Sequence, residues 1–216
     1  ACLSFLSALD VAASLIATQR YARILIVSSE ISSVGLDFAD PETAPLFGDG
    51  AAAVVVSEAA PDDPACLHDV LFETYGDGAS LTELPGCGTR RPPTCPETTR
   101  EDSLFRMNGP ALLKLAAQRG RPFLARLSAR NPELSRDDTL LVPHQASRAG
   151  MRLLEVLGFS PEQTVVTLPS FGNCVAASIP LALFEAVASG RLTPGKRALL
   201  LGTGAGVSFG AALLTL

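Results

Sequence analysis

The sequence predicts an α/β protein, because short apolar strands alternate with helical patterns along the chain. Residues 23–28 form a near-continuous apolar run, which is typical of a strand covered on both faces. Residues 139–142 and 164–168 are two more short strands, each followed by a turn and a helical pattern. Open α/β sheets place their chemistry where strands end, so we expect the functional side chains after these two strands.

The N-terminal elements are predicted in the order helix, strand, loop and strand. Residues 3–19 carry apolar side chains along one side of a helix. Residues 35–46 are expected to be loop, and Gly48 and Gly50 are expected to form a tight turn into a second buried strand at 51–57. Asp49, between these glycines, is interpreted as part of that turn.

A polar, proline-rich stretch at residues 59–64 predicts a boundary between two halves, residues 1–60 and 61–216. We expect the second half to begin with a strand at 66–75, in which His68 is a surface or interdomain residue.

The remaining elements complete the second half. Residues 76–102 are rich in Gly, Pro and Thr and predict a long irregular loop, and a helix follows at 107–129. A helix is expected from 175 to 188, and two closing strands at 196–203 and 207–216 flank a glycine-rich turn.

Composition restricts the function classes. A net charge of −5 argues against a nucleic-acid partner, and no apolar run reaches the length of a membrane span. The five cysteines are scattered, without a CxxC pair or zinc-ligand spacing, so we expect no metal and no cofactor. A reduced, cytoplasmic protein fits this cysteine pattern.

Three residues are candidates for catalysis. His144 and Asn173 each follow a predicted strand, although each could simply be a turn or capping residue. Cys2 stands at the start of the first helix, where the helix dipole would favour a thiolate and lower the pKa of the thiol. The alternative for Cys2 is a small buried hydrophobic residue.

Five motifs together resemble the β-ketoacyl-acyl-carrier-protein synthase III family of thiolase-fold condensing enzymes. The motifs are AC at 1–2, FGDG at 47–50, VPHQA at 142–146, GN at 172–173 with AASIP at 176–180, and GTGAG at 202–206. The resemblance implies a thiolase-like α/β fold with two similar layered α-β halves, the N-terminal half being incomplete here. The part of that half before the nucleophile is expected to come from the same gene product or from a separate chain.

The resemblance also implies the site and its chemistry. Cys2 would take an acyl group from a thioester, and His144 and Asn173 would assist a decarboxylative condensation with a malonyl-type thioester. The backbone N–H near Ala205, in the turn after Gly204, would hold the thioester oxygen together with that of Cys2. Phe47 would lie close to the site.

The resemblance further implies the partners. Acyl carrier protein or coenzyme A thioesters would bring the substrates, Arg148 and Arg152 would bind the carrier protein, and a second copy would complete a homodimer.

Two alternatives remain at this point. One is a relative that transfers an acyl group to a small alcohol or amine, or joins two acyl chains head to head, in secondary metabolism such as polyketide synthesis. The other is a non-catalytic subunit that shapes the pocket of a paired enzyme.

Overall fold

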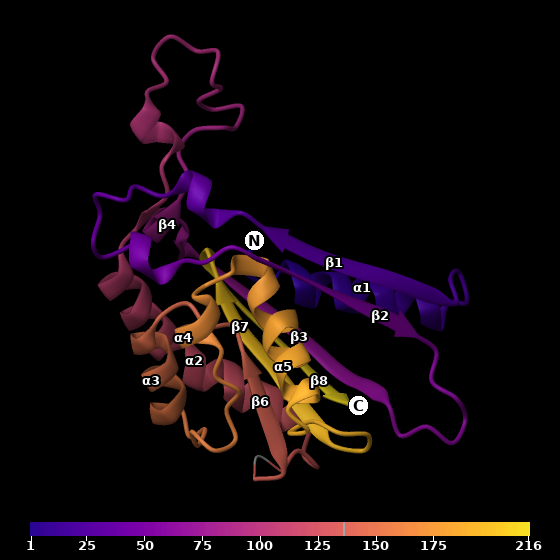
Figure 1. The fold of residues 1–216 in the computed structure, drawn as a ribbon. Coiled ribbons are helices and arrows are strands. Elements are labelled where there is room, and N and C mark those ends of the chain that lie inside the picture. The colour runs from indigo at the N-terminus through magenta and orange to yellow at the C-terminus, as the bar shows by residue number, and fades with distance from the viewer. Residues whose placement is uncertain (136) are drawn as a thin grey trace.

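A computed structural model describes residues 1–135 and 137–216. Figure 1 shows the order and arrangement of the elements. The helices and strands are α1 (Ser4–Ala17), β1 (Arg23–Glu30), β2 (Gly50–Ser57), β3 (Cys66–Gly78), β4 (Thr82–Glu83), β5 (Arg106–Met107), α2 (Gly109–Arg130), β6 (Thr139–Pro143), α3 (Arg148–Val156), α4 (Leu168–Phe171), α5 (Ser178–Ala188), β7 (Arg197–Gly204) and β8 (Gly206–Thr215). Within the described residues, no helix is both long and apolar enough to cross a bilayer.

The longer strands form two separate sheets. β1 and β2 pair antiparallel, and the second sheet has the order β3-β8-β7-β6. In this second sheet β6 and β7 run parallel, so their carboxyl ends meet at one edge. The change from one sheet to the other falls between Ser57 and Cys66, whereas the division into halves at residues 60 and 61 stays a prediction.

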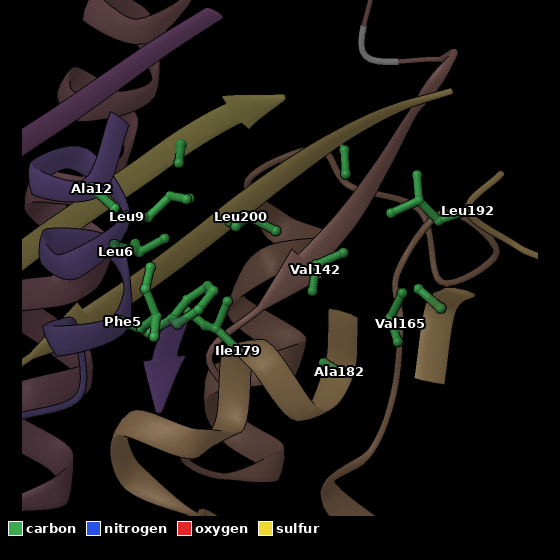
Figure 2. Packing of buried hydrophobic residues seen from close by; sticks show 14 residues of the cluster. Phe5, Leu6, Leu9, Ala12, Val142, Val165, Ile179, Ala182, Leu192 and Leu200 are labelled. Atoms are coloured by element: carbon green, nitrogen blue, oxygen red, sulfur yellow. The ribbon is translucent and has the colours of Figure 1, made fainter. Parts of the chain in front are cut away.

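The four-stranded sheet is covered on both faces. Side chains alternate across a strand, so Ala198 and Leu200 of β7 face one core cluster while Leu199 and Leu201 face another. The first cluster packs against α1 and α5, and the second against α2. Figure 2 shows the first cluster, where Phe5, Leu6 and Leu9 of α1 lie toward Leu200 of β7 and Ile179 of α5. Each fully buried Leu or Phe stabilises the fold by about 1.5–3 kcal/mol.

The prediction that β1 and β2 are buried on both faces is wrong for the described residues. Ile26 is buried against α1, but Leu25, Val27 and Val55 on the opposite face are 63%, 61% and 63% exposed. The apolar run correctly predicts strands, but the helices of this chain cover only one face of their sheet (Figure 1).

The strand predicted at residues 164–168 does not form. This segment has one parallel bridge, between Leu141 and Thr164, and it then turns into the short helix α4. The backbone N–H groups of Thr167 and Leu168 both donate to the side chain of Gln145 instead of to a strand. Pro169, in the first turn of α4, has no N–H and is pre-organised for a helix start.

Candidate active site

A pocket of about 450 Å³ opens beside the carboxyl ends of β6 and β7. Its walls are mainly apolar side chains of α2 and α3, and His144, Asn173 and Phe47 are the predicted site residues among them. An apolar cavity with a few convergent polar groups is the usual form of a small-molecule site.

His144 lies directly after β6, and its backbone N–H donates to the carbonyl of Leu201 on β7 at 2.7 Å. The side chain is only 9% exposed, and burial lowers its pKa from 6.5 to about 4. Its Nδ1 atom has no hydrogen-bond partner in the described part of the chain. The imidazole is therefore neutral at physiological pH and can present a ring N–H to a group in the pocket.

Asn173 reaches the same pocket from a tightly packed corner. Its backbone N–H donates to Leu46 at 2.8 Å, its carbonyl accepts from Gly48 at 3.1 Å, and its Oδ1 accepts from the backbone N–H of Val175 at 3.0 Å. With Oδ1 engaged, the amide Nδ2 is the group that can donate into the pocket.

Gly48 makes this corner possible by close packing, and it is not part of the predicted tight turn. A Cβ at Gly48 would lie 1.9 Å from the carbonyl oxygen of Phe171, and neither Gly48 nor Gly50 has a positive φ angle. Asp49 is therefore not part of such a turn; it accepts hydrogen bonds from the backbone and hydroxyl of Ser33 at 2.9 and 2.6 Å and so holds the loop at Ser33 against the start of β2.

Cys2 lies just before α1 and is not among the residues that line the pocket. A Cβ at Gly204 would lie 3.8 Å from the Cβ of Cys2, and a Cβ at Gly202 would lie 3.0 Å from the Cβ of His144. Two residues along a strand span about 7 Å on the same face. Cys2 and His144 therefore pack over two neighbouring same-face positions of β7, Gly204 and Gly202, near the carboxyl end of the strand.

The predicted lowering of the pKa of Cys2 is wrong. Burial raises the pKa of this thiol above its ordinary value and outweighs the influences that lower it. The residue before α1 makes no side-chain capping bond, and Cys2 lies outside the helix itself. The thiol is therefore protonated at neutral pH.

The other predicted residues lie around this centre. Ala205 is exposed in the turn between β7 and β8, next to Gly204, and Phe47 packs edge-on against Phe105 with ring centroids 5.0 Å apart. Arg148 and Arg152 are exposed one turn apart on α3, where they make no ion pair with the described residues. His68 is exposed on β3, away from the pocket, in agreement with its interpretation as a surface residue.

Sequence reasoning missed Gln145. Its side chain is fully buried and forms three hydrogen bonds to the backbone of residues 165–168. The sequence does offer one indication: Gln145 directly follows His144 at the end of an apolar strand. A polar amide there must find hydrogen-bond partners, because residues 141–145 are all buried.

Comparisons with known proteins agree with this geometry. Residues 1–76 match the family model 3-oxoacyl-[acyl-carrier-protein (ACP)] synthase III, and residues 130–216 match the C-terminal model of the same family. The β-ketoacyl-[acyl-carrier-protein] synthase III of Nitratidesulfovibrio vulgaris is 38% identical over 99% of this chain and 66% of that protein. The synthase III 3 of Streptomyces coelicolor is 36% identical over 99% of this chain and 64% of that protein.

Solved structures give the same result. The synthase III of Thermus thermophilus superposes with a TM-score of 0.83 at 32% identity, covering 100% of this chain and 65% of that one. The Aquifex aeolicus enzyme gives a TM-score of 0.83 at 30% identity, covering 100% and 65%. The chain thus spans about two thirds of the length of these relatives. The predicted thiolase-like α/β fold is confirmed, and the chain belongs to the 3-oxoacyl-[acyl-carrier-protein] synthase III family.

Proposed function

We propose that the protein is an acyl-thioester condensing enzyme that forms a 3-oxoacyl product. The observation that carries this proposal is that Cys2 and His144 pack over Gly204 and Gly202 near the carboxyl end of β7, where His144 and Asn173 line one apolar pocket. A thiol, a neutral imidazole and an amide donor are the groups that this reaction uses. The names of the related proteins support the same reaction class.

In the first half-reaction the sulfur of Cys2 attacks the carbonyl carbon of an acyl thioester. The bond from that carbon to the donor sulfur breaks, and the Cys2 proton leaves with the donor thiol. The backbone N–H groups of Ala205 and Cys2 are the proposed donors to the oxygen on which negative charge develops. Water is a poor competitor at this position, because Cys2 is partly buried.

In the second half-reaction a malonyl-type thioester occupies the pocket. The ring N–H of His144 and the Nδ2 group of Asn173 donate to its thioester carbonyl while the bond to the carboxylate breaks and carbon dioxide leaves. The enolate carbon then attacks the acyl carbon on Cys2, and the cysteine sulfur departs with the electrons of its bond. A neutral imidazole suits this role, since it donates one hydrogen bond without bringing a charge into an apolar pocket.

The proposal extends to partners and setting. Acyl carrier protein or coenzyme A would deliver the substrates in fatty-acid synthesis in the cytoplasm, and Arg148 and Arg152 offer positive charge beside the pocket for the phosphopantetheine carrier. The apolar face formed by Leu25, Val27 and Val55 needs a protein cover, which the expected N-terminal part of the first half, supplied by the same gene product or a separate chain, and a second copy in a homodimer would provide.

The test is a coupled assay with an acyl thioester and a labelled malonyl thioester. The proposal requires a 3-oxoacyl product and release of labelled carbon dioxide, and the Cys2→Ala variant must lose the product. Acyl transfer to another acceptor without carbon dioxide release, or an unchanged rate in Cys2→Ala, would reject it.

A further inference from the structure

The side chain of Gln145 ties together the two chain segments that carry His144 and Asn173. Its Nε2 group donates to the carbonyl of Val165 at 3.0 Å, and its Oε1 atom accepts from the N–H groups of Thr167 and Leu168, each at 2.9 Å. The side chain is 0% exposed. A buried amide is stable only when its hydrogen bonds are made, so this arrangement fixes the geometry of both segments.

Two of these hydrogen bonds act at the start of α4. α4 has no side-chain cap of its own, because the hydroxyl of Thr167 makes no capping bond. The Oε1 atom of Gln145 instead accepts from the N–H groups of Thr167, the residue before the helix, and Leu168, its first residue, and so satisfies backbone donors at the helix start. The point at which α4 begins is therefore set by a residue 23 positions earlier in the chain.

Both ends of this connection lead into the site. Gln145 directly follows His144, whose backbone is bonded to Leu201. α4 leads through Gly172, with φ of +67°, directly to Asn173. In contrast, Cys2 lies just before α1, and none of the three hydrogen bonds of Gln145 reaches that part of the chain.

We propose that Gln145 is a positioning residue that sets the separation between the donor groups of His144 and Asn173. This inference rests on the proposed function. It assigns Gln145 to the half-reaction at the malonyl-type acceptor and not to acyl transfer onto Cys2. The side chain touches neither substrate, because all of its polar atoms are used by the backbone.

The experiment compares the two half-reactions in the full polypeptide. Acylation of Cys2 is followed by intact-protein mass spectrometry, and decarboxylation by release of labelled carbon dioxide from a malonyl thioester. Gln145→Met keeps the length of the side chain but removes all three bonds. Its decarboxylation is expected to fall by about tenfold to a hundredfold, as displaced catalytic groups do, while acylation stays within about twofold. Gln145→Glu keeps the two bonds to Oε1 and is expected to restore part of the loss.

Asn131→Leu is the matched control. Asn131 is also a buried amide, bonded to Asp69 at 2.8 Å and to Leu127 at 2.9 Å, but it lies at the far end of α2. Its loss is expected to lower stability without changing the ratio of the two half-reactions. A parallel fall of both rates in Gln145→Met, or unchanged decarboxylation, would overturn the assignment. If Gln145→Met does not fold, the ratio of decarboxylation to acylation in Gln145→Glu tests the assignment instead. Wild-type protein that performs neither half-reaction would instead overturn the proposed function itself.

Discussion

Gly202 and His144 pack so closely that a side chain at Gly202 would collide with the imidazole-bearing residue. A Cβ there would lie 3.0 Å from the Cβ of His144, and on its other side 2.9 Å from Cδ2 of Leu3, the residue after Cys2. Because Gly202 has no side chain, the segment that carries Cys2 and the segment that carries His144 can both pack against β7 at this position.

We expect Gly202→Ala to reduce condensation by about a hundredfold, because displacement of reacting groups by about 1 Å has an effect of that size. Steady-state kinetics of product formation give the measurement, and circular dichroism checks that the fold is retained. Gly76→Ala is the control, since Gly76 lies on exposed β3 with nothing within 4 Å of an added Cβ. Full activity in Gly202→Ala would show that this close contact is not required.

Gly48→Ala is expected to destabilise the protein by about 2 kcal/mol or more, which is the range for overpacking against rigid neighbours. The added Cβ would lie 1.9 Å from a backbone oxygen of Phe171, which cannot move aside as a flexible side chain can. Denaturant unfolding measures the effect, again against Gly76→Ala. A denaturant midpoint equal to that of the wild type would mean that the backbone around Gly48 and Asn173 shifts to accommodate the added methyl group.

Stability should depend on pH through His144. Its pKa is about 4 in the folded protein and near 6.5 when the residue is in water, so the unfolded chain binds the proton more readily. The contribution of the neutral imidazole is fully present above pH 6.5 and is lost as pH falls toward 4. The total loss is about 3 kcal/mol, since each unit of pKa shift corresponds to about 1.4 kcal/mol.

Unfolding free energies measured between pH 7.5 and 4 test this linkage. The His144→Gln variant should lose part of the slope, whereas His68→Gln, at the exposed histidine, should keep it. Equal slopes in the wild type and His144→Gln would contradict the burial of a neutral imidazole.

Arg148→Glu and Arg152→Glu are expected to raise KM for substrates on acyl carrier protein several-fold and to leave kcat nearly unchanged. The two exposed side chains lie one turn apart on α3, and reversal of their charge would repel an acidic partner. Kinetics at two salt concentrations provide the measurement, because the effect should shrink as salt screens the charges. Arg20→Glu, beyond the opposite end of α1, is the matched control, and an equal effect there would point to net charge alone.

The strands and helices that surround the site could be predicted from hydrophobic periodicity, but the segment at residues 164–168 could not. Its β-branched residues favour a strand, and only the three-dimensional position of Gln145 shows which groups take its N–H donors. Likewise, the run at 23–28 indicates a strand but does not tell how many of its faces this chain covers.

The sequence predicts which residues form the candidate site but not how they are arranged or how buried they are. The order of the motifs indicates Cys2, His144 and Asn173 as candidates, but only the folded strand β7 shows that Cys2 and His144 pack over its glycines Gly204 and Gly202. The pKa of Cys2 was predicted in the wrong direction, because position at a helix start is visible in the sequence whereas burial by distant segments is not.

Intact-protein mass spectrometry after incubation with a panel of acyl thioesters tests the central claim most directly. We predict one acyl adduct per chain, mapped by proteolysis to Cys2 and absent in Cys2→Ala. The chain length that reacts fastest would also identify the preferred donor. An adduct on another cysteine, or no adduct from any donor with Cys2 unreactive toward iodoacetamide, would contradict the assignment of Cys2 as the nucleophile.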